Sequence, residues 1–308
     1  MRPTLAVLVA LLALTTAGAL AATRGAPRVV AKITTGQGPC SEAGGYGAVW
    51  VGNYGSSDVA RIDPKTNRVT KRIPVGSSPC GIGIGAGAVW VDGWGTGYVE
   101  RIDPHKLRVT KRVRVAPGFT LWDVTFGAGS VWGTDYTGGV VIRVDPKTMR
   151  VVKRIKVDGQ PSNLRFGAGS LWVGSQIGTS IFRIDPKTNA VTTIDVGHPS
   201  PDSPAVSNTA VWVANRLDNT VSRIDPATNT VIATVPVGQH PANPAIAPNG
   251  VVFVPLKGEN KVAWIDATTN TVGGKLPAGP GPFPAAEAFG DIWVPDNLGT
   301  QVFRIRPS

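Results

Sequence analysis

Residues 48–76, AVWVGNYGSSDVARIDPKTNRVTKRIPVG, contain three strand-forming segments separated by two turn segments. The first segment, 48–51, is rich in β-branched and aromatic residues, which favour β-strands. Segments 58–62 and 68–75 read as the second and third strands. The intervening DPKTN has Asp to cap a turn, Pro to fix φ and Asn to tolerate a left-handed backbone. The stretch therefore predicts an antiparallel meander of three strands.

This meander recurs along the chain about every 40 residues, a strand-rich period that is typical of a β-propeller blade. Each unit is preceded by a strand of small residues, such as PCGIGI at residues 79–84, which suits a crowded propeller centre. We therefore label the four strands of a unit A to D from the centre outwards. The turn between strands C and D contains Asp63, Asp103, Asp145, Asp185, Asp225 and Asp266, and Arg306 stands in the last copy.

Seven inner strands can be counted, so the propeller should have seven blades. Arg28–Thr34 resembles an outer strand without an earlier blade, and the last unit lacks an outer strand. The sequence thus predicts an all-β, seven-bladed β-propeller of four-stranded antiparallel blades, as one domain over residues 22–308. The N-terminal outer strand closes the last blade and removes exposed edges. The inner strands are expected to begin near Pro39, Pro79, Leu121, Pro161, Pro201, Pro241 and Pro282.

The first 21 residues are predicted to be a signal peptide. An apolar run follows Met1 and Arg2, and Ala19-Leu20-Ala21 fits the small-x-small cleavage rule, so the exported chain should begin at Ala22. The alternative is an uncleaved membrane anchor, because an apolar stretch of about 18 residues can just span a bilayer. Export makes a disulfide plausible between Cys40 and Cys80, which occupy equivalent positions in neighbouring repeats. The alternative is two packed thiols.

The unit VWVANRLDNTVSRIDPATNTVIATVPVG, residues 211–238, resembles the YVTN family of β-propeller repeats. The matching elements are V-W-V-x-N, the D-x-x-x-N-x-V turn and strand, and the terminal P-V-G; all seven units fit, over residues 28–308. The resemblance implies an extracytoplasmic propeller, of a family whose members often have a binding function or no assigned function. A more distant resemblance is to the streptogramin (virginiamycin B) lyases, which are seven-bladed propellers with repeated P-x-x-I and W-F motifs.

The lyase resemblance implies a His after the inner-strand Pro and a Glu closing W-x-x-E in strand B. Neither is present, and the elimination needs a base within hydrogen-bond reach of the proton it removes. The first position holds Cys40, Cys80, Trp122, Ser162, Asp202, Ala242 and Phe283, and the second holds Asn53, Gly93, Asp135, Ser175, Asn215, Leu256 and Asp296. A metal-dependent enzyme of the streptogramin lyase or lactonase type is kept as the alternative function.

The D–A and B–C loops open on one face, where polar and aromatic side chains should surround a central mouth. Carboxylates and amides there could bind Ca²⁺ or Mg²⁺ through oxygen; the alternative is a hydrated mouth with ordinary turn residues. Trp94 and Trp122 break the repeat and are predicted to stack on a ligand. The candidate ligand-binding residues are Trp94, Trp122, Asp123, Asp135, Asn163, Asn215, Asn243 and Asp296, with Glu42 and Glu287 further along their inner strands.

Two histidines of consecutive D–A loops, His198 and His240, are weak catalytic candidates together with Asp202. They could act as general base or as ligands, and the alternative is that they are solvated loop residues. Recurrent residues have a structural interpretation instead. Strand B carries Trp and strand C carries Arg in six repeats each, which predicts packing between blades with Arg on aromatic faces.

Charge departs from the repeat most clearly. The net charge is +11, and residues 28–160 contain 19 Lys and Arg against 10 Asp and Glu, whereas residues 161–308 contain 10 of each. The excess lies on predicted outer strands and forms what we call the basic rim: Arg68, Lys71, Arg72, Arg108, Lys111, Arg112, Arg114, Arg150, Lys153, Arg154 and Lys156.

We therefore predict an exported, non-enzymatic binding protein, monomeric, that engages an anionic polymer, nucleic acid or envelope surface through this rim and a small ligand at the mouth. The alternative for the rim is edge protection against aggregation.

Overall fold

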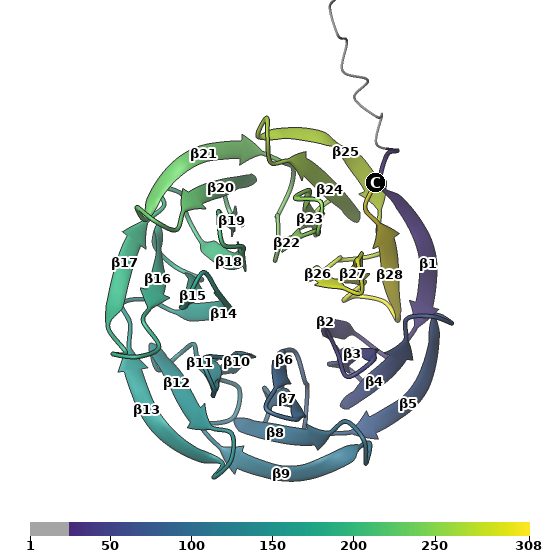
Figure 1. Ribbon diagram of the computed structural model, residues 1–308, viewed down its shortest axis with the longest axis vertical. Helices are drawn as coiled ribbons and strands as arrows, with labels where there is room; N and C mark the ends of the chain where they lie inside the picture. The colour runs from purple at the N-terminus through teal and green to yellow at the C-terminus, as the bar shows by residue number, and fades with distance from the viewer. Residues whose placement is uncertain (1–24) are drawn as a thin grey trace, which may run out of the picture.

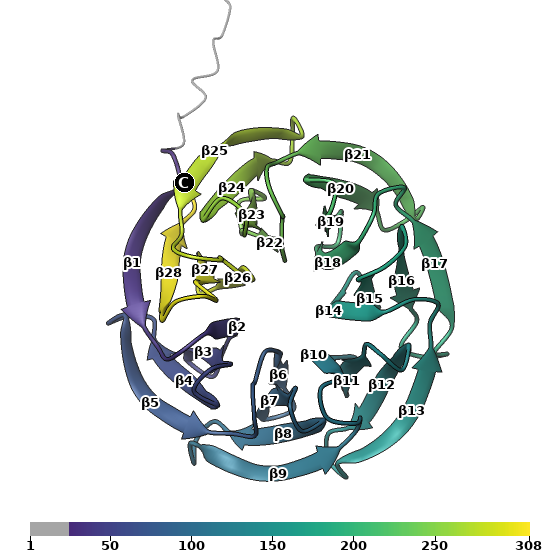
Figure 2. The same cartoon turned by 180° about the vertical axis from the view of Figure 1, so that it is seen from behind.

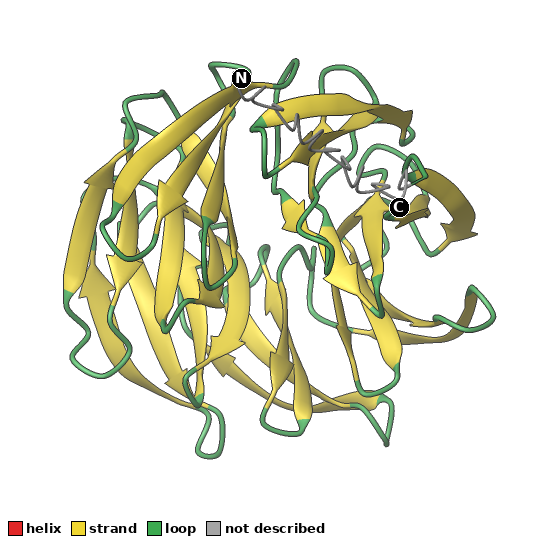
Figure 3. Cartoon of the chain, turned by 45° about the horizontal axis from the view of Figure 1, so that its top comes forward, coloured by secondary structure: helices red, strands yellow, loops and turns green. Residues whose placement is uncertain are grey.

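The computed structural model describes residues 25–308 and confirms the seven-bladed propeller (Figure 1). Seven four-stranded antiparallel sheets surround a central axis, and the described chain contains no helix (Figure 3). No helix of residues 25–308 is therefore long and apolar enough to cross a membrane. The predicted signal peptide, residues 1–21, lies outside the described residues.

Six blades follow one another along the chain, each running from its inner to its outer strand. Blades 1 to 3 consist of β2 (Pro39–Gly45), β3 (Ala48–Asn53), β4 (Asp58–Asp63) and β5 (Arg68–Pro74); β6 (Ile82–Gly85), β7 (Ala88–Gly93), β8 (Tyr98–Asp103) and β9 (Arg108–Arg114); β10 (Leu121–Gly127), β11 (Ser130–Asp135), β12 (Val140–Asp145) and β13 (Arg150–Lys156). Blades 4 to 6 consist of β14 (Pro161–Gly167), β15 (Ser170–Ser175), β16 (Ser180–Ile184) and β17 (Val191–Asp195); β18 (Pro201–Val206), β19 (Val211–Asn215), β20 (Thr220–Asp225) and β21 (Thr230–Pro236); β22 (Ala245–Ile246), β23 (Val252–Leu256), β24 (Lys261–Asp266) and β25 (Thr271–Pro277).

Blade 7 joins the two ends of the described chain, as predicted. Its strands are β26 (Ala286–Ala288), β27 (Asp291–Pro295), β28 (Gln301–Arg306) and, on the outside, β1 (Arg28–Thr34). Strand β1 pairs antiparallel with β28, from Arg28 opposite Arg306 to Thr34 opposite Gln301. The view from behind shows β1 completing the ring beside β28 (Figure 2). Because of this pairing, β28 has a partner strand on both sides, and β1 forms the outer edge of the blade.

Three inner strands begin three or four residues later than the sequence predicts. Strands β6, β22 and β26 start at Ile82, Ala245 and Ala286, although Pro241 and Pro282 still form isolated bridges. In blade 2 the Oδ1 atom of Asp92 accepts the backbone N–H groups of Cys80 and Gly81, both at 2.7 Å. These donors are therefore used by a side chain instead of a strand ladder.

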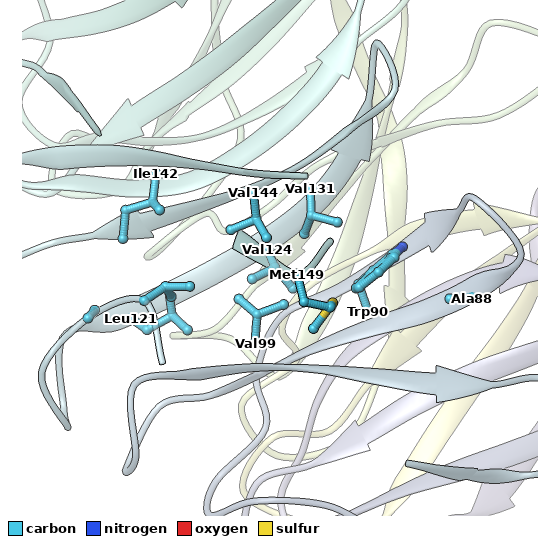
Figure 4. Close-up of a cluster of buried hydrophobic side chains, with 11 residues drawn as sticks. Ala88, Trp90, Val99, Leu121, Val124, Val131, Ile142, Val144 and Met149 are labelled. Carbon is cyan, nitrogen blue, oxygen red and sulfur yellow. The ribbon is translucent and has the colours of Figure 1, made fainter. Parts of the chain in front are cut away.

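Each blade buries its strand-B aromatic residue against the following blade. Trp90 of blade 2, for example, packs with Leu121, Val124 and Met149 of blade 3 (Figure 4). Phe253 replaces Trp in blade 6 and packs against Ile292 of blade 7. All seven interfaces follow this order, and the six tryptophans are at most 1% exposed: Trp50, Trp90, Trp132, Trp172, Trp212 and Trp293.

The strand-C arginines add a polar clasp to four of these interfaces. The guanidinium carbon of Arg143 lies 4.8 Å from the centroid of the Trp132 ring, and its Nη1 donates to Asn189 Oδ1 (3.1 Å) and the Pro186 carbonyl (2.8 Å) of the next blade. The same pairs are Arg183 with Asn229, Arg223 with Asn270 and, across the junction of blades 7 and 1, Arg304 with Asn67. We call this contact the Arg–Asn clasp.

Within residues 25–308 the clasp is absent at three junctions. Between blades 6 and 7 the arginine is missing, because Trp264 stands opposite Phe253 at that position. Between blades 1 and 2 and between blades 2 and 3 the asparagine is missing. The turn position that holds Asn elsewhere is occupied by Leu107 and Met149, whose side chains pack into the apolar interfaces. Arg61 and Arg101 instead donate to Thr70 and Thr110 of their own blades. Blades 1 and 2 are joined differently, because Cys40 and Cys80 form a disulfide with their Cα atoms 4.9 Å apart.

Replacing Asn189 by Gly tests the clasp. Asn189 has φ 61°, which Gly adopts without strain, so the substitution removes the amide acceptor and leaves the turn intact. We expect a loss of about 1–3 kcal/mol in the free energy of unfolding, because the lost hydrogen bond has a charged donor. Urea unfolding measures it.

The Arg143→Met background provides the control. There the same Asn189→Gly change should have a much smaller effect, since the donor is gone. An equal loss in both backgrounds would show that the Asn acts through its turn and not through Arg143.

Candidate functional site

In each blade one residue lies just after strand B, directly behind it in six blades and two residues behind it in blade 7, and these seven residues together surround the mouth of the central channel. In six blades the backbone N–H of this residue donates to a carbonyl just before the inner strand, as Tyr54 does to Gly38 (2.8 Å) and Arg216 to Ser200 (3.0 Å). This shared hydrogen bond holds the position in the same place while its side chain varies. We call these residues the mouth ring: Tyr54, Trp94, Tyr136, Gln176, Arg216, Lys257 and Asn297.

Blades 1 to 3 make half of the mouth aromatic. The ring centroids of Tyr54 and Trp94 are 6.0 Å apart, those of Trp94 and Phe119 are 5.1 Å apart, and those of Trp122 and Tyr136 are 5.4 Å apart. Phe119 is 62% exposed. A cavity of about 250 Å³ lies here, lined by Cys40, Tyr54, Cys80, Trp94, Trp122 and Asn297. The predicted ligand-stacking residues Trp94 and Trp122 therefore line one cavity, with the disulfide beside them.

Blades 4 to 6 make the other half polar and cationic. Arg216 Nη2 donates to Gln176 Oε1 (3.2 Å), and Gln176 Nε2 donates to Asp202 Oδ1 (3.0 Å). Lys257 Nζ lies 5.4 Å from the centroid of the Phe283 ring. Burial lowers the pKa of Lys257, with the charge of Arg216 adding to the effect. Burial likewise raises the pKa of the Asp202 carboxyl against hydrogen bonds and cations that lower it.

The two halves form a continuous space. A second cavity, of about 410 Å³, is lined by Gln176, Asp202, Arg216, His240 and Lys257 in the cationic half. It shares Cys40, Cys80, Trp122 and Asn297 with the aromatic cavity. The disulfide and Trp122 thus lie at the boundary between the aromatic half and the cationic half.

Below the mouth, the inner strands are connected by buried hydrogen bonds. Asn163 Nδ2 donates to Asp202 Oδ1 (3.2 Å) and to Ser203 Oγ (3.0 Å), and the Ser203 hydroxyl donates to Asn243 Oδ1. Ser162 Oγ donates to the Asp202 carbonyl at 2.7 Å. The structure therefore brings the predicted residues Asn163, Asp202 and Asn243 together, but as partners of one another on β14, β18 and the segment before β22.

Deeper in the channel, carboxylates outnumber cations. Arg165 Nη1 is 2.9 Å from Asp123 Oδ2, and burial raises the pKa of Asp123 against that ion pair. Glu42 is 5% exposed, and neither of its carboxyl oxygens has a hydrogen-bond partner within residues 25–308. Burial raises the pKa of Glu42 well above its ordinary value; Arg165 opposes this and Asp123 adds to it. Glu42 and Arg165 line the far part of the channel, a cavity of about 480 Å³ that Glu287 also lines.

Three predicted ligand-binding residues serve their own turns instead of the mouth. Asp135 Oδ1 accepts the N–H of Gly138 (3.0 Å), and Asp296 Oδ1 accepts that of Gln301 (2.6 Å). Asn215 Nδ2 donates to Thr220 and Ser222 hydroxyls. They are the last residues of strand B or adjoin it, one position before the mouth ring, and side chains at successive positions of a strand point to opposite sides. None of them lines either mouth cavity.

The histidines and the possible metal ligands are also separated. His198 Nδ1 pairs with Asp218 and its Nε2 lies 3.3 Å from Thr234 Oγ1 of the outer strand β21, so its ring is held away from the mouth. His240 does line the cationic cavity. In the part of the chain that the structure describes, no group of three or more His, Cys, Asp or Glu side chains could hold a metal ion.

Sequence reasoning missed six residues of the mouth ring: Tyr54, Tyr136, Gln176, Arg216, Lys257 and Asn297. A signal for them existed, because the mouth ring position recurs in every unit directly after the V-W-V-x-x segment and yet changes chemistry from blade to blade. The repeated hydrogen bond fixes the backbone at this position, so the fold does not require a particular side chain there. A side chain that varies between blades at such a position therefore indicates a surface available for binding. The residues predicted instead, such as Asp135 and Asp296, lie one position before the mouth ring and are needed for the hydrogen bonds of their own turns.

The basic rim is exposed along its whole length. All eleven predicted side chains are exposed, on β5, β9 and β13, which are adjacent on the outside of the ring (Figure 1). Three have local partners: Arg72 pairs with Asp58 (2.6 Å), Arg112 lies over Tyr98, and Arg154 donates to the Val115 carbonyl. The other eight have no ion-pair or hydrogen-bond partner among residues 25–308.

Glu42→Gln tests the buried carboxyl. A folded-state pKa raised by burial gives stability that is fully present below the unfolded pKa and is lost as the pH rises towards the folded pKa. The wild type should therefore lose about 1.4 kcal/mol per pH unit relative to Glu42→Gln from about pH 4.5 upwards, until the folded pKa is reached. Urea unfolding between pH 4 and 8 measures the difference.

Glu287→Gln is the matched control, because Glu287 lines the same cavity but is exposed. Its stability should run parallel to the wild type across this pH range. A parallel curve for Glu42→Gln as well would mean that water reaches Glu42 freely.

Comparison with known proteins supports the fold and the repeat. A family described as a repeat of unknown function (DUF6923) matches residues 81–205. No curated protein matches the chain in sequence. Among solved structures, a streptogramin B lyase superposes with a TM-score of 0.80 at 15% identity, covering 92% of this chain and 98% of that one.

A catalytically inactive virginiamycin B lyase from Staphylococcus aureus with quinupristin gives a TM-score of 0.78 at 15% identity, covering 92% of this chain and 100% of that one. Hydrazine synthase of Kuenenia stuttgartiensis gives 0.75 at 15% identity, covering 90% and 97%. At these identities the likeness concerns the fold. The chain is thus a seven-bladed β-propeller of repeated units, structurally similar to streptogramin B lyase.

Proposed function

We propose that the protein is an exported, non-enzymatic binding protein that engages an anionic polymer through the basic rim. The observation that supports this most strongly is the eight exposed, unpartnered cations gathered on β5, β9 and β13. A row of such charges attracts a polyanion by releasing its condensed counterions, without any need for a shaped pocket.

Edge protection does not account for the distribution of these charges. The outer strands of blades 4 and 5, β17 and β21, contain no Lys or Arg, and β25 contains only Lys275, which pairs with Glu259 at 2.8 Å. All of these strands occupy the same outer position in their blades. If cations were needed to stop edge-to-edge pairing, every outer strand would need them. The one-sided rim therefore favours a partner that contacts blades 1 to 3.

Binding is favoured over catalysis by the absence of the implied lyase base from its motif positions and by the placement of the histidines. His198 is paired with Asp218, and no hydrogen bond joins the ring of His240 to a carboxylate within residues 25–308. Export is supported by the predicted signal peptide and by the disulfide, since disulfides persist in oxidising compartments.

Replacing Lys71, Lys111 and Lys153 together by Gln tests the rim. These residues are equivalent in register, since they lie opposite Arg61, Arg101 and Arg143. We expect at least a tenfold weaker affinity for a 20-base-pair DNA duplex, used here as a polyanion probe. The slope of log K against log salt should fall by about 2 to 3, because each phosphate contact contributes about 0.9. Fluorescence anisotropy at several salt concentrations measures both.

A variant with the same net charge separates local contact from overall charge. Thr192→Glu, Thr193→Glu and Ile232→Glu together remove three units of charge at exposed positions of β17 and β21. This variant should keep most of the affinity. Equal weakening by the two triple variants, or no salt-dependent binding by the wild type, would contradict the proposal.

The export part of the proposal predicts a specific N-terminus. Expressed with its own leader in a bacterium, the protein should be recovered outside the cytoplasm with Ala22 as its first residue, because Ala19-Leu20-Ala21 matches the cleavage rule. Intact mass spectrometry of the exported fraction measures this. Membrane-bound protein that retains the leader would establish the anchor alternative.

A further inference from the structure

We infer that the mouth binds a small planar aromatic carboxylate, with its rings in the cavity of Tyr54, Trp94 and Trp122 and its carboxylate beside Arg216 and Lys257. This site is separate from the basic rim, since it is built from the loops at the channel mouth instead of the outer strands.

The aromatic half is suited to a flat ring system. Tyr54, Trp94 and Trp122 supply three ring faces or edges around a cavity of about 250 Å³, with the Cys40–Cys80 disulfide beside them. Aromatic side chains contribute stacking and edge contacts in addition to the apolar area that they bury. Trp94 Nε1 is buried and has no hydrogen-bond acceptor within residues 25–308. It is therefore a free donor at the margin of this half.

The cationic half is suited to an anion. Arg216 and Lys257 are two cations beside one carboxylate, Asp202, whose Oδ1 already accepts hydrogen bonds from Gln176 and Asn163. Arg216 Nε is buried with no acceptor among the described residues, and Lys257 has no ion-pair partner there. A carboxylate ligand would supply acceptors to these donors and balance the excess positive charge, which makes charge-assisted hydrogen bonds.

The two halves are joined at the right place for one molecule. Both cavities include Cys40, Cys80, Trp122 and Asn297, so a ligand on Trp122 reaches the cationic half without leaving the protein surface. A bicyclic arene with one carboxylate matches this division into an apolar part and a charged part. A neutral arene would leave the cations unbalanced, and an aliphatic acid would leave the aromatic walls without a stacking partner.

The test is isothermal titration calorimetry with three probes: 2-naphthoate, its neutral amide 2-naphthamide, and cyclohexanecarboxylate. We expect 2-naphthoate to bind one to one, and at least tenfold more tightly than either of the other two. Binding of naphthoate that is absent up to millimolar concentration, or no stronger than that of naphthamide, overturns the proposal. This comparison uses only the wild-type protein and so does not depend on any variant folding.

Variants then assign the two halves. Arg216→Gln should weaken naphthoate binding about tenfold and leave naphthamide binding unchanged, whereas Trp94→Leu should weaken both. Lys261→Gln removes the same charge from an exposed position of β24 that lines neither mouth cavity, and it should change neither. Equal effects of Arg216→Gln and Lys261→Gln would place the anion elsewhere on the surface. The lysine-to-glutamine variant of the rim should bind naphthoate normally, so failure of one proposal does not imply failure of the other.

Discussion

Each blade buries its strand-B aromatic residue, tryptophan in six blades and Phe253 in blade 6, against the blade that follows it, and this contact is the constraint on which the propeller depends. Trp90 of blade 2 packs against blade 3, and Trp293 of blade 7 packs against blade 1, so the same packing that joins neighbours also closes the ring. In four interfaces the arginine above the tryptophan extends to an asparagine of the next blade, and Arg304 with Asn67 makes this clasp across the ring closure. Because these contacts are repeated, a blade can vary at its loops and outer face without loss of the scaffold.

Several departures from the repeat lie in blades 1 to 3. These blades lack the Arg–Asn clasp at two junctions, contain the disulfide, supply the aromatic half of the mouth and carry the basic rim. Leu107 and Met149 replace the clasp with apolar packing, so these junctions still bury their tryptophans. Blades 1 to 3 thus combine the disulfide, the aromatic half of the mouth and the basic rim on one side of the ring.

The fold could be predicted from the sequence because its signals are local and repeated. Turn residues such as Asp63 and Asn67 and the alternating strands between them need only neighbouring residues for their explanation. The mouth was predicted in part: Trp94 and Trp122 meet there, but Asp135, Asn215 and Asp296 do not, because a residue that can cap a turn looks identical in sequence to one that faces a ligand. Arg216 and Lys257 could not be paired in advance, since they come from different blades.

Hydrogen–deuterium exchange with and without a DNA duplex tests most directly whether function lies on this side of the ring. The account predicts slower exchange in β5, β9 and β13, whose exposed cations would contact the polyanion, with β17 and β21 unchanged. Protection spread evenly over the seven outer strands, or confined to blades 4 to 6, would contradict the assignment of binding to blades 1 to 3.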